Sequence, residues 1–241
     1  MNSLKMNKSW SFAVVILLLF LISSDIALAG PGGLIKEAGK TFWGKVIMGG
    51  ILVVFAPLLT WYLMRRARLV KQTRKLITQI ALSDSRFEWM DLKDRITQIF
   101  LWVHSAWDQK KMLIAEQYVT EWYMQNQQLL LDKWDRDGLE NKVSDVVIKK
   151  ITPLYVMQNI KDVSKNRIVV EIEAEMRDYM VNKNTGKLIQ GDKRLGTVST
   201  LWSLVWRQGN WQLNLIEASD MDMEYLAEPN KIYALAEDTA A

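Results

Sequence analysis

The stretch that decides the fold is Ile168–Arg177, IVVEIEAEMR, because apolar and charged side chains alternate along it. Successive side chains of a β-strand point to opposite faces of a sheet, so the alternation separates two faces. One face carries Ile168, Val170, Ile172, Ala174 and Met176, and the other carries Val169, Glu171, Glu173, Glu175 and Arg177. The pattern predicts a strand of an antiparallel sheet with one face on an apolar core.

The sequence on both sides of this strand keeps the period of two. Residues 143–163 mix strand-forming residues with Pro153, which predicts a bulge or an edge position. The predicted elements after the central strand are a turn at 182–186, a strand at 195–206, a hairpin loop at 207–210 and a strand at 211–217. These elements predict a meander of three or four long strands.

Before residue 140 the period is that of helices. Ser83-Asp84-Ser85 predicts a helix cap. An amphipathic helix follows from the spacing of Ile96, Ile99, Phe100, Val103 and Trp107. A second helix is predicted over about 112–134, closed by residues 135–138. Helices followed by a meander predict an α+β domain over 84–219, with two or three helices packed on one face of an antiparallel sheet.

Three aromatic segments within this domain carry a family resemblance. They are FLWVHSAWD at 100–108, the second helix with Tyr118 and Trp122, and LVWRQGNWQL at 204–213. Together they resemble the C-terminal domain of the forty-four-kilodalton subunit of the mitochondrial inner-membrane import translocase, in its bacterial membrane-anchored form. The resemblance covers about Ser85 to Ser219, and it rests on aromatic spacings and contains no catalytic signature.

The resemblance implies a cone-shaped fold, cystatin-like or nuclear-transport-factor-two-like, with a concave sheet and an apolar pocket. The mitochondrial member of the family tethers a chaperone motor to a protein-conducting channel at the membrane. The resemblance therefore implies a membrane-tethered scaffold with a membrane protein or chaperone as its partner, and no enzyme activity.

An apolar run of nineteen residues, 46–64, precedes the domain. As a helix it is roughly 28 Å long, close to the ~30 Å hydrocarbon core of a bilayer, which predicts a transmembrane helix. It is followed at once by Arg65, Arg66, Arg68, Lys71, Arg74 and Lys75, with no acidic residue between Lys45 and Asp84. These residues predict a basic juxtamembrane helix, 65–83, on the cytoplasmic side. Its side chains either bind anionic lipid headgroups or act only as a topology signal.

Both ends of the chain have patterns of their own. Residues 1–29 have the basic start, apolar block and Ala27-Leu28-Ala29 close of a signal peptide, and the alternative is an uncleaved first span. A short Gly-containing external segment, 30–45, follows, and residues 220–241 form an acidic tail. We therefore expect an inner-membrane protein that crosses the membrane once after signal cleavage, with its folded domain in the cytoplasm.

Composition excludes several classes of function. The net charge of +4 comes from the juxtamembrane run, so no nucleic-acid partner is expected. The absence of cysteine excludes disulfides, zinc ribbons and thiol nucleophiles, and a single histidine, His104, excludes multi-histidine metal sites. We expect no cofactor or metal, and we interpret His104 as structural.

Glu171, Glu173 and Glu175 could bracket a cation or substrate, but a solvent-exposed face of the strand explains them better. Their expected cross-strand partners are Lys149, Lys150, Lys193 or Arg194.

The hairpin tryptophans leave two interpretations open. Trp202, Leu204, Trp206 and Trp211 could pack beneath the helices, or they could line a pocket that binds a partner or an apolar chain. The first hypothesis is a membrane-tethered binding domain that recruits a protein or a lipid. The alternative is a pocket enzyme or carrier for an apolar membrane-derived molecule, in which Tyr155 and Tyr179 could take part.

Overall fold

The computed structural model describes residues 42–218 and 230–233. The signal-like segment 1–29, most of the predicted external segment and most of the predicted acidic tail lie outside the described residues. The chain divides into two units, Met1–Trp61 and Tyr62–Ala241. Each unit is described here by itself.

The first described element is a single long helix, α3 (Phe42–Ala81), with Pro57 inside it. Helix α3 spans the apolar run 46–64 and most of the basic run 65–83, and it ends at Ala81. In the described part of the chain, no helix reaches the length and apolar character that crossing a membrane requires. The membrane span at 46–64 is therefore not confirmed and stays a prediction.

The helical half of the domain contains η1 (Ser85–Phe87), α4 (Trp89–Asp108), η2 (Met112–Tyr118) and α5 (Glu121–Arg136). Asp84 caps η1 through Arg86 N–H, as the predicted cap requires. The single helix predicted over 112–134 is wrong in one respect. The chain becomes extended at Val119 and Thr120, and the Thr120 side chain caps a new helix by accepting from Tyr123 N–H.

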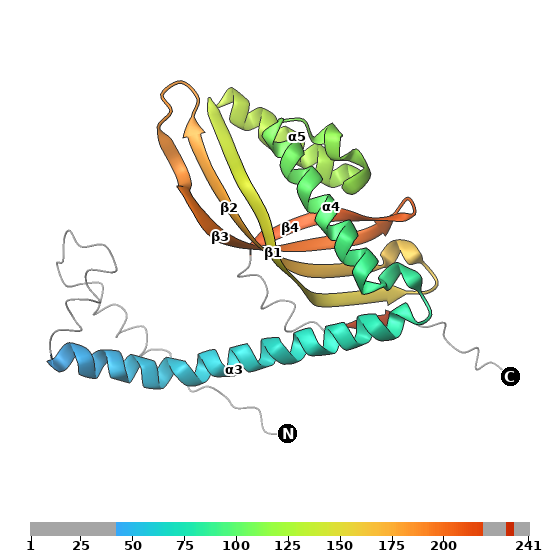
Figure 1. Ribbon diagram of the computed structural model, residues 1–241, viewed down its shortest axis with the longest axis horizontal. Coiled ribbons are helices and arrows are strands. Elements are labelled where there is room, and N and C mark those ends of the chain that lie inside the picture. Colours follow the sequence, from blue (N-terminus) through green and yellow to red (C-terminus); the bar gives the residue numbers. More distant parts are fainter. Residues whose placement is uncertain (1–41, 219–229, 234–241) are drawn as a thin grey trace, which may run out of the picture. The chain divides into compact units, whose positions relative to one another are not determined.

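The sheet contains β1 (Leu139–Asn159), β2 (Arg167–Asn182), β3 (Leu188–Arg207), β4 (Asn210–Ala218) and the short β5 (Lys231–Tyr233). Its order is β4-β3-β2-β1-β5, with β5 parallel to β1 and every other pair antiparallel. A short 3₁₀ helix, η3 (Val163–Lys165), joins β1 to β2. The α+β meander is confirmed, with strands longer than predicted (Figure 1). The finer cystatin-like assignment stays a prediction.

Strand β1 is irregular, as Pro153 predicted. Its pairing with β2 shifts register between Ser144 and Val147, between Ile148 and Lys150, and again between Pro153 and Tyr155. Asp145 lies in the first irregularity with a φ of 56°. Bulges bend a strand and change where its side chains point, so β1 presents its residues unevenly along its length.

The core lies between the sheet and the helices. The apolar face of β2 is buried throughout, as predicted, against side chains of α4 such as Ile96, Phe100 and Val103. On the opposite face, Leu154, Tyr155, Val169 and Leu201 form a smaller buried cluster.

The glutamate face of β2 differs from the predicted solvent face. Glu171 is largely buried: it pairs with Arg66 of α3 and accepts a hydrogen bond from Ser199 Oγ at 3.0 Å. Glu175 pairs with Lys149 at 2.7 Å, which confirms the predicted cross-strand partner. Helix α3 therefore covers part of this face, which the alternation alone could not show.

Candidate binding groove

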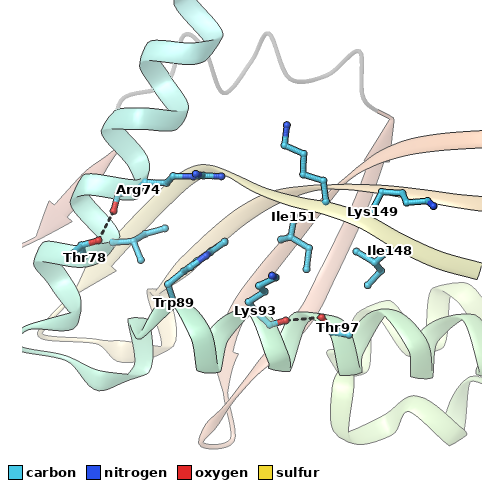
Figure 2. A pocket seen from close by; sticks show the side chains of 10 residues that line it. Arg74, Thr78, Trp89, Lys93, Thr97, Ile148, Lys149 and Ile151 are labelled. Carbon is cyan, nitrogen blue, oxygen red and sulfur yellow. Dashed lines mark hydrogen bonds between the residues drawn. The ribbon is translucent and has the colours of Figure 1, made fainter.

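A cavity of about 560 Å³ opens between the C-terminal part of α3, the first half of α4 and the middle of β1 (Figure 2). We call it the α3–α4 groove. Its lining comes from three elements: Arg74, Ile77 and Thr78 of α3; Trp89, Lys93 and Thr97 of α4; and Ile148, Lys149, Lys150 and Ile151 of β1. All of them belong to the unit that begins at Tyr62.

The two helical walls have the same construction. On α4 the lining residues Trp89, Lys93 and Thr97 are four positions apart, and residues at this spacing share one helix face. On α3 the residues Arg74 and Thr78 have the same spacing. The hydroxyl of Thr78 donates to Arg74 O at 3.0 Å, and that of Thr97 donates to Lys93 O at 2.9 Å. Since both hydroxyl protons are used within their helices, the walls act on a ligand mainly through charge.

The floor of the groove is formed by β1 at a bulge. The register shift between Ile148 and Lys150 leaves Lys149 as the extra residue. This irregularity lets adjacent lysines and two isoleucines border the same space. Strand β5 pairs with β1 only at Met157–Asn159, so the outer edge at 148–151 has no strand partner among the described residues.

The groove is strongly basic. Four of its ten lining residues are cations, and none is acidic. Lys149 shares its charge with Glu175, whereas Arg74, Lys93 and Lys150 have no ion pair in the described ranges 42–218 and 230–233. Like charges near one another repel, and a groove lined with one sign of charge attracts a ligand of the other sign. The arrangement therefore favours an anionic ligand.

The structure does not place the predicted lipid-headgroup residues on one surface. Arg66 pairs with Glu171, and Arg74 lines the groove. The remaining predicted residues, Arg65, Arg68, Lys71 and Lys75, are exposed along α3. Their role at headgroups stays a prediction.

The four residues of the predicted tryptophan site also do not share one surface. Trp202 and Leu204 are buried in the core, where the Trp202 ring lies 5.1 Å from that of Phe100. Trp206 and Trp211 pack edge to face, with ring centroids 5.6 Å apart. These two border a second, shallower cavity of about 300 Å³, together with Ser85, Arg86, Asp91, Leu92, Arg95 and Asn210.

The buried titratable groups lie outside the groove. Burial lowers the pKa of His104, whose Nδ1 lies 2.8 Å from Phe100 O, and its ring contacts those of Phe100 and Trp202. Burial raises the pKa of the Tyr123 hydroxyl, which has no hydrogen-bond partner in the structure. Neither residue lines the groove. Both positions are consistent with structural roles.

The two candidate tyrosines are separated in the fold. Tyr155 is buried in the small cluster that includes Leu154, whereas Tyr179 is half-buried beneath Lys193, whose Nζ lies 5.7 Å from the ring centroid. Neither borders the groove. Among the described residues, no group of three or more potential ligands is arranged to hold a metal ion.

Sequence reasoning missed the α4 wall and the β1 floor of the groove. The spacing of Trp89, Lys93 and Thr97 is visible in the sequence, but on a surface helix it suggests only a polar face. What makes it part of a site is the approach of α3, which depends on contacts between residues far apart in the chain. Of the predicted site residues, Arg74 alone lines the groove.

The fold is an α+β domain with a basic groove between two of its helices and one strand. Comparison of sequences assigns its family: residues 73–218 match the Tim44-like domain. This match covers more than half of the chain, so the chain belongs to the Tim44-like domain family, as the aromatic spacings predicted. No curated protein sequence matches the chain.

Comparison of structures finds the intermembrane-space region of the chloroplast protein ARC6. The two chains share 14% sequence identity, and the match covers 48% of this chain and 92% of the ARC6 chain, with a TM-score of 0.32. A similarity this low carries no argument about function.

Proposed function

We propose that this chain is a membrane-tethered binding or scaffold protein whose Tim44-like domain recruits an anionic partner into the α3–α4 groove. The observation that carries the proposal is the groove itself, with Arg74, Lys93, Lys149 and Lys150 in its lining and no acidic residue. Arg74, Lys93 and Lys150 have no ion pair among the described residues, and a groove lined with one sign of charge attracts a ligand of the other sign. A protein segment and a lipid are both partners of this class.

The groove supports binding better than it supports an enzyme or a carrier of apolar molecules. General acid–base chemistry needs a group that exchanges protons near neutral pH within reach of a substrate. The groove offers arginine, lysine and threonine side chains, and the one histidine is buried elsewhere. A carrier for an apolar molecule needs a mostly apolar lining, and here four of ten residues are charged.

The tether is proposed to be the apolar part of α3. Residues 46–64 are apolar in sequence, and the large apolar side chains described there are exposed: Val46, Ile51, Val53, Val54, Phe55, Leu58, Leu59, Trp61, Leu63 and Met64. Exposed apolar surface of this extent is unfavourable in water and marks an interaction site. The arginines and lysines that follow are typical of a cytoplasmic flank, so we place the domain at the cytoplasmic face of an inner membrane.

Flotation with liposomes tests the tether. We expect the full chain to float with phosphatidylcholine liposomes and the variant Val54→Glu/Leu58→Glu to remain in the dense fraction, because each charge in the hydrocarbon region costs about 2.5–3.5 kcal/mol. The matched control is Ile189→Glu/Leu195→Glu, two exposed apolar residues on β3, which should float like the unchanged chain. Equal flotation of both variants would contradict the tether.

The absence of cysteine allows a direct test of sidedness. A single Thr185→Cys substitution in the exposed β2–β3 turn should react with a membrane-impermeant maleimide only after the cytoplasmic side is opened. Labelling of intact cells would place the domain on the other side of the membrane.

A further inference from the structure

We propose that the α3–α4 groove binds an extended, acidic peptide segment of a partner protein, one that carries aliphatic side chains between its carboxylates. This inference rests on the proposed binding function and names the class of partner. Four features of the groove support it: the distribution of its charges, its length, its apolar contacts and an edge of β1 that has no strand partner among the described residues.

The charges are spread along the groove. Figure 2 shows Arg74 and Lys93 directed into the space between the two helices, whereas Lys149 points along β1 away from it. Cations from both helical walls therefore reach different parts of a bound molecule. A single phosphate interacts best with cations gathered around one point, whereas a chain with several separate carboxylates can satisfy a distributed set.

The length of the groove suits a short extended segment. Trp89 and Thr97 mark its α4 wall, and eight residues of helix rise about 12 Å. An extended chain advances about 3.3 Å per residue, so this length accommodates roughly four residues. Alternate side chains of such a segment are about 7 Å apart on the same side. Carboxylates at that spacing can contact cations at successive points along one side of the groove.

The apolar contacts are small and separate. Ile77 and Ile151 are buried at the base, and Trp89 and Ile148 are half-buried beside them. These surfaces suit single aliphatic side chains. A long acyl chain needs a continuous dry tunnel, and here the charges interrupt the apolar surface. The lining therefore favours a peptide over the tail of a lipid.

The edge of β1 adds backbone groups. At 148–151 the strand has no neighbour on its outer side among the described residues, and an unpaired strand edge can hydrogen-bond an added extended peptide. The bulge between Ile148 and Lys150 interrupts a regular ladder, so backbone pairing is limited to a short stretch. Charge then provides most of the selectivity.

The test measures peptide binding to the full chain held in nanodiscs of neutral phosphatidylcholine. The probe is a fluorescein-labelled peptide of alternating leucine and glutamate, followed by fluorescence anisotropy. We expect Lys93→Gln/Lys150→Gln to weaken binding roughly 3- to 10-fold, because each exposed ion pair contributes modestly. The control Lys161→Gln/Lys187→Gln removes two exposed lysines outside the groove and should bind as the unchanged chain does. A peptide with glutamine in place of glutamate should not bind.

Several results would overturn the proposal. One is equal peptide affinity for the groove variant and the control variant. Another is a groove variant that loses binding to phosphatidylglycerol liposomes while peptide binding is unchanged, since the ligand is then a lipid and the broader binding function stands. A third is peptide binding that appears only after Asp220→Asn/Asp222→Asn/Glu224→Gln, which would identify the chain's own acidic segment as the occupant. If the groove variant changes neither peptide nor liposome binding, the proposed function of the groove fails as well.

Discussion

The two halves of α3 form one continuous helix for different physical reasons. Residues 42–61 carry apolar side chains that are exposed wherever they are described. Residues 62–81 carry most of the basic residues and bury Thr73, Ile77 and Ile80 against the domain. A surface helix of a folded domain has one apolar face, and only the second half follows that rule.

The comparison shows that the apolar residues of a helix need not be buried. The second half is attached to the domain by several kinds of contact. Besides the buried Ile77 and Ile80, Val70 packs against the small cluster with Leu154 and Tyr155, and the Thr73 hydroxyl donates to Leu154 O at 3.1 Å. The first half has more apolar residues, and its described side chains are exposed. The following experiments test this difference.

The largest difference is expected between two isoleucines. Ile77→Ala should lower the free energy of unfolding by about 2–4 kcal/mol, because it leaves a cavity in the core. Ile51→Ala, in the exposed half, should change it by less than about 0.5 kcal/mol. Urea unfolding of the full chain in mild detergent measures both. Equal losses would remove the distinction between the two halves.

Two threonines sharpen the comparison. The buried Thr73 hydroxyl donates to Leu154 O and accepts from Asn230 Nδ2 at 2.9 Å. Thr73→Val keeps the shape but leaves both partners unsatisfied, which should cost about 1–3 kcal/mol. Thr60→Val, at an exposed position of the first half, should be nearly neutral. Thermal unfolding distinguishes them, and a neutral Thr73→Val would mean that water replaces the lost hydroxyl.

Acid should destabilise the turn that follows the second half of α3, where Asp84 caps η1. Burial by itself raises the pKa of Asp84, but hydrogen bonds from Arg86 and Gln158 outweigh it and hold the pKa below its usual value. The stabilisation that the Asp84 carboxylate provides is therefore complete above the pKa of this group in the unfolded state, near 4. It is lost as the pH falls through the lower pKa of the folded state. Asp84→Asn should cost about 1 kcal/mol at pH 7 and progressively less below about pH 4. A cost independent of pH would exclude the carboxylate charge as its cause.

The smallest effect concerns two arginines of the second half. Arg66→Gln removes the ion pair with Glu171 and should lower stability by about 0.5–1 kcal/mol, whereas Arg68→Gln, at an exposed position, should have no measurable effect. High salt should reduce the difference. If Arg68→Gln proves the more destabilising variant, the assignment of Arg66 to the fold and Arg68 to the surface is wrong.

The sequence predicted the fold class better than the site. Alternation over Ile168–Met176 correctly placed the core face of β2, and Pro153 correctly marked an irregular strand, because both signals are local. The break at Thr120 was missed because the apolar spacing continues across it, and only the capping hydroxyl reveals a new helix. The extent of β3 was underestimated because residues 188–194 are exposed on both faces and show no alternation of apolar and polar residues.

The groove could not be found by the same reasoning. Lys93 and Lys150 are unremarkable surface lysines in the sequence, and they lie in one cavity only because α3 and α4 flank the bulge in β1. Trp202 was named because it alternates with Leu204 and Trp206 on one strand face, and packing beneath the helices was one of the two interpretations. In the structure it packs against Phe100, and its Nε1 donates to Thr200 Oγ1 at 2.9 Å.

The contact between Thr73 and Asn230 also bears on the order in which the domain is completed. The Asn230 side chain donates to the Thr73 hydroxyl, and its Oδ1 accepts from Val156 N–H at 2.8 Å, so one residue joins α3 to β1. Thr73 and Asn230 are 157 positions apart in the chain. During synthesis α3 emerges from the ribosome long before Asn230 does, and strand β5 follows Asn230. The wall of the groove formed by α3 is thus among the last parts of the domain to acquire all its native contacts.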